Sequence, residues 1–448
     1  MMRNVRYLPV ALSLMLASAP ALAADGDAPA KPAPTGLLPV PDYSGDFWNR
    51  STLTGDWGGT RNDLAKKGVQ LTLDWTQYVQ SVVDGGRKET TAYGGHADYL
   101  LKLDLMQMGL LPGALVTFRA ESRYGHTVNG DVGTALPVNT AGFFPLTSPL
   151  DDGVEFYITN LNYVQFLSEQ FAVILGKVDT LDGDPNEFAS GRGKSQFMDS
   201  DFIFNSALAL RLPYSSLGAG ILILPMKGIT ITSTLVNTTD SSSTTGFEDF
   251  GKGYSWSTEA DFQYRLGNLP GGMNVGGLYS FAQDFTKLGD RLIFQPGQGL
   301  AVPKQHDTWT AYWSMWQYLY VQDPSDLPIN LSNGMPDHKG IGFFARLGFA
   351  DQDTNPIRWS GSLGFGGRGL IPTRDNDIYG IGYYYTRFQP LRLTGLLGIG
   401  DESQGFEAFY NLAITPAAHL SFDLQVQNTP LPNIDTAIIL GMRLNLSF

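Results

Sequence analysis

Charged residues with complementary chemistry stand at alternating positions of two neighbouring segments. Arg119, Glu121 and Arg123 follow one another at every second residue, and Lys102 and Asp104 do the same in the preceding segment. A guanidinium group donates hydrogen bonds in a rigid fork and a carboxylate accepts them, so a wall of both kinds suits a solute with many hydroxyl groups. The same charges could instead pair with one another and only stiffen the wall. The spacing predicts that they share one face of a strand.

Further arginines at alternating positions are candidates for the same wall: Arg346, Arg358, Arg387 and Arg443. Tyr383 and Tyr385 share their face with Arg387. If that arginine faces an aqueous interior, the two rings offer a stacking surface there; otherwise they belong to an aromatic band at a membrane surface. The spacing leaves both interpretations open.

Other chemistries find little support in the sequence. The pattern Asp-x-Asp-x-Asn begins at Asp182 and again at Asp351, which places oxygen ligands at alternate positions as calcium loops do. The glycine that such a loop needs next is replaced by Glu187 and by Pro356, so Asx turns are the favoured interpretation. The five histidines lack metal-ligand spacing, and nothing nominates a nucleophilic triad. We therefore predict no metal, no cofactor and no enzyme.

Composition narrows the class of protein. The chain has 448 residues, of which 52 are glycine and none is cysteine; 12% are aromatic, 16% are charged, and the formal net charge is -13. The charged share lies below the ~25% of soluble domains. An acidic chain with a pI near 4.8 is not a nucleic-acid binder. Beyond residue 24, no apolar run approaches the ~20 residues of a membrane-spanning helix. What remains is a protein of short strands.

The first residues have the features of a targeting segment. Residues 1–23 begin with Arg3 and Arg6, continue with a short apolar run and end in Ala-Leu-Ala, which is the pattern of a secretory signal peptide. An uncleaved membrane anchor is the alternative, but the apolar run is too short to span a bilayer comfortably.

Two further segments precede the strands. Residues 24–50 are rich in proline and alanine and are predicted to form an extended, poorly ordered leader. Residues 51–68 are predicted to contain a short helix, with Thr60 as its N-cap and Gly68 as its left-handed terminator. The strand pattern occupies residues 69–448.

Apolar and polar residues alternate strictly in five segments: residues 115–123, 255–266, 341–349, 420–427 and 438–448. A soluble β-sandwich also alternates, but its strands average ~5–6 residues, whereas these reach the ~9–11 residues of a tilted membrane strand. Their polar faces carry charges of both signs, as a wet lumen requires. Aromatic residues such as Trp309, Trp313 and Trp316 cluster at segment ends, as in an interfacial band. The fold class is therefore an all-β, transmembrane antiparallel β-barrel.

The connections predict the size and orientation of the barrel. They are short at residues 110–113 and 268–271, and long and polar at residues 124–153 and 237–253. Short turns on one rim and long loops on the other are the outer-membrane arrangement. At ~10 residues per strand plus connections, residues 69–448 accommodate about 16 strands, which leaves an aqueous channel.

Four stretches carry a family resemblance: Leu53–Gly59 with Lys67–Val69, Gly176–Thr180 continuing through Asn186–Gly193 to Gln196–Met198, Pro213–Gly220, and Phe406–Pro416 followed by Gly441–Arg443 and the terminal Phe448. As a set they resemble the carbohydrate-selective outer-membrane porins of the OprB family. The resemblance covers the chain from about residue 51 to its end.

The resemblance implies a pore of 16 strands in the bacterial outer membrane that admits sugars by passive diffusion, with a periplasmic N-terminal helix. It also implies assembly by the outer-membrane machinery, which reads the aromatic Phe448, and a lumen narrowed by arginines and glutamates. The candidates for that lining, placed by alternation, are Arg119, Glu121, Arg123, Lys102, Asp104 and Arg346. A general or organic-anion-selective porin, an outer-membrane enzyme and a plugged structural barrel are the alternatives. Monomer and homotrimer both stay open.

Overall fold

The computed structural model describes residues 36–147, 152–209, 211–288, 293–295, 299–323, 338–390 and 398–448. The predicted signal peptide at residues 1–23 and the first part of the leader lie outside the described residues. Within these ranges, no helix is long and apolar enough to cross a membrane.

Most of the described chain forms strands, and sixteen of them close into one antiparallel barrel. The predicted fold and strand number are therefore confirmed. The barrel strands are β1 (Val69–Gly86), β2 (Thr90–Asp104), β3 (Ala114–Gly125), β4 (Val154–Ser168), β5 (Phe171–Asp179), β6 (Ser215–Met226), β7 (Ile229–Asn237), β8 (Tyr254–Leu266), β9 (Leu269–Thr286), β12 (Lys304–Val321), β13 (Gly340–Ala350), β14 (Ile357–Arg368), β15 (Ile378–Phe388), β16 (Glu402–Thr415), β17 (Ala418–Asn428) and β18 (Asp435–Ser447).

Each barrel strand pairs with its neighbour along the chain, and β1 closes the barrel against β18, with Tyr78 opposite Arg443. The pairing of β9 with β12 skips β10 (Ile293–Gln295) and β11 (Gly299–Ala301), which form a separate two-stranded sheet. Closure leaves no strand edge unpaired, which is what a sheet in lipid requires.

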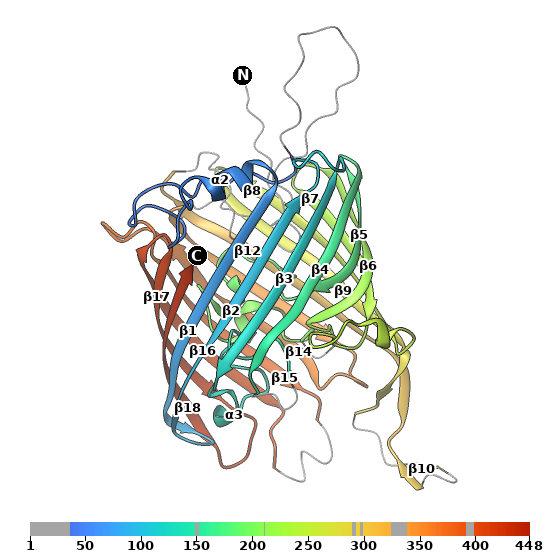
Figure 1. Ribbon diagram of the computed structural model, residues 1–448. Coiled ribbons are helices and arrows are strands. Elements are labelled where there is room, and N and C mark those ends of the chain that lie inside the picture. Colours follow the sequence, from blue (N-terminus) through green and yellow to red (C-terminus); the bar gives the residue numbers. More distant parts are fainter. Residues whose placement is uncertain are drawn as a thin grey trace.

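The two rims of the barrel differ, as Figure 1 shows. The turns β4–β5, β6–β7, β8–β9 and β16–β17 are two residues each, and they share the upper rim with the C-terminus and with α2 (Thr60–Lys66). The β3–β4, β5–β6 and β7–β8 connections are much longer and leave from the lower rim, where α3 (Asn129–Val132) lies. The predicted asymmetry between short turns and long loops holds for these connections.

The N-terminal helix begins one residue away from the predicted cap. Gly59, with φ 91°, is the N-cap, and no side chain caps the helix, so the prediction of Thr60 as N-cap is wrong. Gly68 has φ 86°, which is the left-handed conformation predicted for the terminator.

Side chains alternate between the two faces of the wall as predicted. In β13, Phe349 is 46% exposed on the outer face, whereas Phe344 and Arg346 are 1% and 3% exposed on the inner face. The outer face thus exposes apolar side chains, whereas the inner face carries charged side chains and rings that are covered from within the barrel. This is the inverse of a soluble sheet and fits lipid outside.

The aromatic residues predicted to form an interfacial band do not all lie on the outer face. Trp309 is 46% exposed on the outer face, but Trp316 is 9% exposed and packs inside against Phe188, so Trp316 does not belong to an interfacial band. Tyr383 is 40% exposed and outside, whereas its neighbour Tyr384 is inside and 2% exposed.

Arg387 shares the outer face with Tyr383 and pairs with Asp401 at 2.5 Å and with Glu402 at 3.3 Å. It therefore does not line the lumen. Of the two interpretations of Tyr383 and Tyr385, the outer aromatic band is the one that the structure supports.

The first described residues of the leader pack against the barrel. Leu37 and Leu38 are 2% and 4% exposed and lie in a buried cluster with inner-wall residues that include Leu115 and Ile174. Tyr43 is 6% exposed. The expectation of a poorly ordered leader therefore does not hold for Leu37, Leu38 and Tyr43, because these side chains are buried, whereas residues 44–49 are exposed.

Candidate functional site

Residues 180–209 and 211–214, between β5 and β6, fold back into the barrel; we call them the inner loop. They include the 3-10 turn η1 (Gly191–Gly193) and α4 (Ser200–Ile203). Phenylalanines of the inner loop share one buried cluster with aromatic side chains of the wall: Phe188, Phe197, Phe202, Trp316, Tyr318, Phe344, Tyr384 and Phe409. Because these rings leave water only when the loop lies inside, apolar burial holds the loop against the inner wall.

Glycines of the inner wall make room for these rings. A Cβ atom on Gly342 or Gly366 would lie 2.5 or 2.6 Å from an atom of Phe188, and one on Gly382 would lie 2.5 Å from Phe202. Side chains do not approach so closely, so β13, β14 and β15 need glycine at these positions for the inner loop to fit. Part of the high glycine content therefore serves the lumen.

Arg346 holds the inner loop from β13. Its Nε lies 2.8 Å from a carboxylate oxygen of Asp184, its Nη1 donates to the main-chain oxygen of Phe202 at 2.6 Å, and its Nη2 donates to that of Ala189 at 2.7 Å. These contacts occupy the donors of the guanidinium group. Arg346 thus positions the loop and does not present its charge to a solute.

Two more residues of the barrel wall bind the main chain of the inner loop between Gly193 and Met198. Glu407 of β16 accepts a hydrogen bond from the main-chain N–H of Met198 at 2.5 Å. Arg443 of β18 donates to the main-chain oxygens of Gly193 and Gln196 at 2.5 and 2.6 Å. With Arg346, these groups attach the loop to several strands of the barrel.

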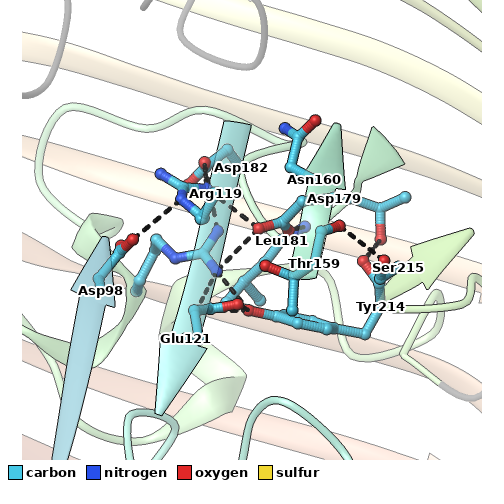
Figure 2. Close-up of polar contacts among 12 residues, drawn as sticks. Asp98, Arg119, Glu121, Thr159, Asn160, Asp179, Leu181, Asp182, Tyr214 and Ser215 are labelled. Carbon is cyan, nitrogen blue, oxygen red and sulfur yellow. Dashed lines mark hydrogen bonds and ion pairs between the residues drawn. The ribbon is translucent and has the colours of Figure 1, made fainter. Parts of the chain in front are cut away.

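Arg119 of β3 lies in a buried cluster of ion pairs on the β2–β5 side of the lumen (Figure 2). Its Nε is 3.3 Å from an oxygen of Asp98 on β2, and its Nη1 is 3.0 Å from Asp179 on β5 and 2.8 Å from Asp182 of the inner loop. One guanidinium group thus joins two wall strands to the loop: it donates hydrogen bonds to Asp179 and Asp182 and forms an ion pair with Asp98.

Arg192 is the second guanidinium of this cluster and comes from the inner loop. It lies 3.0 Å from Glu121, 2.9 Å from Asp179 and 3.2 Å from Asp182. The hydroxyl of Tyr214 donates to both carboxylate oxygens of Glu121, at 2.9 and 2.7 Å. Glu121 therefore receives donors from the middle of the inner loop and from its last residue.

The backbone around Arg192 is unusual. Gly191, Arg192 and Gly193 have φ values of 80°, 55° and 73°, so three consecutive residues are left-handed. For arginine this conformation costs roughly 1–2 kcal/mol, which its ion pairs offset. Just beyond it, Lys194 Nζ lies 2.5 Å from Asp98.

The inner-loop members of the cluster have shifted protonation equilibria. Burial by itself would raise the pKa of the Asp182 carboxyl, but Arg192 and Arg119 hold that pKa below its usual range. Burial raises the pKa of the Tyr214 hydroxyl, so the group stays a donor to Glu121. Removing one partner from such a buried pair costs about 3–5 kcal/mol because the other charge stays uncompensated.

Alternation correctly places Arg119, Glu121 and Lys102 on the inner face. They are 6%, 1% and 7% exposed, respectively, because neighbouring strands and the inner loop cover them. Of the two interpretations of these charges, the contacts of Arg119 and Glu121 support ion pairing, although their partners are Asp98, Asp179, Asp182 and Arg192 rather than each other.

Asp104 has a different place from the predicted one. Its carboxylate accepts hydrogen bonds from the main-chain N–H groups of Leu37 at 2.5 Å and Leu38 at 2.8 Å. It lies at the last residue of β2, on the rim that carries α2. Asp104 therefore anchors the N-terminal segment and does not join the cluster around Arg119.

Arg123 holds a second loop, the one that follows β3. Its Nη1 donates to the main-chain oxygens of Gly142 and Phe143, both at 2.7 Å, and its Nη2 donates to that of Asp152 at 2.6 Å. Its donors thus serve the loop, as those of Arg346 do.

The two Asp-x-Asp-x-Asn segments serve structural contacts. Asp182 and Asp184 pair with Arg119 and Arg346, and Asp351 accepts the N–H of the residue two positions on at 2.9 Å, which is an Asx turn. Among the described residues, no group of three or more histidine or acidic side chains could hold a metal ion.

Sequence reasoning missed several members of the cluster: Asp98, Asp179, Arg192, Lys194 and Tyr214. Asp98 stands at an alternate position of the same strand as Lys102, so alternation could have identified it. Arg192 and Lys194 lie within a stretch that carries the family resemblance, but no spacing relates them to β3.

A cavity of about 340 Å³ lies between the inner loop and the wall strands β5, β7, β8, β9 and β12. Asp179 and Tyr214 belong both to its lining and to the ion-pair cluster. Arg119 and Glu121 lie behind them. The charged lining residues are Asp179, Asp184, Arg211, Asp240 and Glu259.

A family profile described as carbohydrate-selective porin, OprB family, matches residues 88–448. The chain belongs to this family. The resemblance stated from the motifs is thus confirmed, and the location is the bacterial outer membrane. The rim with α2 and the short turns is accordingly the periplasmic one.

Solved structures support the fold. The high-pH structure of OprB from Pseudomonas putida is 18% identical, with a TM-score of 0.75 over 90% of this chain and 100% of that one. The low-pH structure of the same protein is 16% identical, with a TM-score of 0.56 over 90% and 99%. The outer-membrane channel DcaP of Acinetobacter baumannii is 10% identical, with a TM-score of 0.50 over 85% and 97%. A search of curated proteins found no match. The family and the fold are those of channels.

Proposed function

We propose that this porin passes carbohydrates, glucose and similar sugars, by passive diffusion through a lumen that the inner loop narrows beside Arg119 and Glu121. The observation that carries the proposal is that each of these charges is paired with side chains of opposite charge: Arg119 with Asp98, Asp179 and Asp182, and Glu121 with Arg192. Arg119 and Arg192 each lie within 3.3 Å of carboxylates, so little of their charge acts on a passing ion. A narrow polar passage with paired charges favours neutral, hydroxyl-rich solutes over salts.

The lining of the cavity supports the same solute class over organic anions. Four of its five charged side chains are acids, and Arg211 is the only cation that lines it among the described residues. Carboxylates accept hydrogen bonds from sugar hydroxyls, and a lining with one cation offers few charged donors to an organic anion. A purely size-selective porin would need no such lining.

Liposome swelling tests the proposal directly. Purified protein is reconstituted and the entry rates of glucose, a disaccharide, and neutral and anionic non-sugar solutes of matched size are compared. Faster entry of glucose than of the matched neutral solute is the expected result. Entry ranked by size alone would indicate a general porin, and preference for the anion would reverse the argument from the lining.

Assembly through the outer-membrane machinery at Phe448, and a homotrimer, complete the proposal. The N–H of Phe448 donates to the main-chain oxygen of Leu73 at 2.8 Å, so the last residue closes the barrel against β1. Deleting Phe448 should lower the amount of folded protein in the outer membrane. Chemical cross-linking in native membranes would show three subunits or only one.

A further inference from the structure

Four inward side chains of β7 and β8 form a polar patch on one side of the cavity. Thr232 stands opposite Glu259 and Thr234 stands opposite Ser257 in the strand register, and all four line the cavity. Neighbours along a strand face are ~6.5–7 Å apart and opposite neighbours are ~5 Å apart. Glu259 is held in place by the hydroxyl of Tyr312, which donates to it at 2.6 Å.

The hydroxyls of this patch differ from those on the outer face of the same strands. Ser233 and Thr258, which face outward, hydrogen-bond to each other at 2.8 Å. Thr232, Thr234 and Ser257 make no such bond to any residue of the described ranges. In lipid a hydroxyl must find a partner within the protein, whereas an inward hydroxyl can bind water or a solute. The inner hydroxyls are thus available to a ligand.

Aromatic rings line the same cavity from its loop side. Phe144 and Tyr214 stack with centroids 4.7 Å apart and planes inclined by 17°, and Phe204 meets Phe144 edge-on at 6.1 Å. Tyr214 cannot swing away easily because its hydroxyl is bonded to Glu121. Phe144 is half-buried, so part of its ring is accessible from the cavity.

We infer that this cavity is a binding subsite for one pyranose ring; the inference rests on the proposed function and deepens it. A pyranose has an apolar face of C–H groups and a rim of hydroxyls that both donate and accept. The apolar face packs on Phe144, and the hydroxyls replace water on Thr232, Thr234 and Ser257. A cavity of about 340 Å³ is at the lower end of small-molecule sites, which suits a monosaccharide.

The subsite separates two tasks within the lumen. The arginines hold the inner loop in place, whereas the hydroxyl patch and the aromatic rings contact the sugar. When the sugar binds, its hydroxyls exchange hydrogen bonds to water for hydrogen bonds to the patch, and each exchange changes the free energy of binding little. The sugar can therefore leave as readily as it enters. Discrimination then comes from matching both faces of the ring at once.

The test uses the double variant Thr232→Val, Thr234→Val, which removes two hydroxyls at nearly constant volume, and the single variant Phe144→Leu. The matched control is Thr258→Val, the same substitution on the outer face of β8. Folding of each variant is verified by its heat-dependent shift on a denaturing gel. The readouts are the swelling rate for glucose relative to a size-matched neutral non-sugar, and the conductance in potassium chloride.

We expect both variants to lower the glucose preference by about threefold or more. This corresponds to the loss of one or two hydrogen bonds in the double variant and of one ring contact in Phe144→Leu. The conductance of both variants in potassium chloride, and the glucose preference of the Thr258→Val control, should equal those of the wild type. Folded variants with an unchanged glucose preference would overturn the subsite while leaving the proposed function intact. A wild-type protein without any glucose preference would instead overturn both.

Discussion

Arg61 of α2 donates from Nη2 to the main-chain oxygen of Phe448 at 2.8 Å, and the same nitrogen donates to that of Leu71 at 2.6 Å. One buried side chain of the N-terminal segment thus joins the first strand to the last residue, at the seam where the barrel closes. The ring of Tyr43 covers the guanidinium group at 3.9 Å, which excludes water from it.

Replacing Arg61 by alanine should therefore weaken the seam. Two main-chain acceptors lose a charged donor, which costs about 1.5–3 kcal/mol for each such bond at most. We expect the temperature at which the folded band converts to the unfolded band on a gel to fall. Lys66→Ala, on the same helix but with an exposed ion pair, is the control and should leave that temperature unchanged. Equal behaviour of the two variants would contradict the role of Arg61.

The double variant Arg119→Ala, Glu121→Ala should widen the constriction. One positive and one negative charge leave the cluster together, so its net charge is unchanged, but the inner loop loses the contacts of Asp182 and Arg192 to β3. We expect higher conductance and weaker discrimination between sugars and salt in planar bilayers. Arg387→Ala on the outer face is the matched control. Unchanged conductance and selectivity would place the constriction elsewhere.

Gly382→Ala should disturb the inner loop from the wall side. The new methyl group would lie 2.5 Å from the ring of Phe202, so the ring or the strand must move. Overpacking of this kind costs about 1–3 kcal/mol, and a displaced loop should increase current noise in single channels. Gly277→Ala, whose Cβ would have an ordinary contact at 3.5 Å, should behave like the wild type. If the currents of Gly382→Ala are as quiet as those of the wild type, the ring of Phe202 has room for the added methyl group, which would contradict this prediction.

Stability should depend on pH through Asp201 of α4. Burial raises the pKa of Asp201 to about 6, although its carboxylate accepts hydrogen bonds from Ser206 and Thr386. The folded protein therefore holds a proton that the unfolded chain, with a pKa of ~3.9, releases. Stability should fall as pH rises from about 4 to about 6 and stay level above that.

The measurement is the gel conversion temperature between pH 4 and pH 8, for the wild type and for Asp201→Asn. The amide cannot ionise, so the variant should lose part of this pH dependence. Asp199, whose pKa burial and its neighbour Asp201 also raise, contributes in the same direction. A variant with the full wild-type slope would assign the effect to other groups.

Local patterns in the sequence were sufficient to predict the wall. Strand side chains alternate with period two, so the residue types alone assign Arg119 and Glu121 to one face and Phe118 to the other. The interior position of Trp316 also follows from the alternation of a strand. Trp309 and Trp316 stand an odd number of residues apart, so they lie on opposite faces. The prediction of an interfacial band was wrong for Trp316 because it rested on the clustering of tryptophans and not on which face each one occupies.

Only the tertiary structure decided which charges meet and where a solute can bind. Arg192 reaches Glu121 from a loop 71 residues further along the chain, and no periodicity relates them. The position of that loop depends on the closed barrel, since Phe188, Phe197 and Phe202 are buried in a cluster with rings of β12, β13, β15 and β16. The alternation of a strand is a property of neighbouring residues, which the sequence alone determines. The stacking of Phe144 on Tyr214 in the cavity that Thr234 also lines is a property of closure and loop folding, which spacing along the chain does not determine.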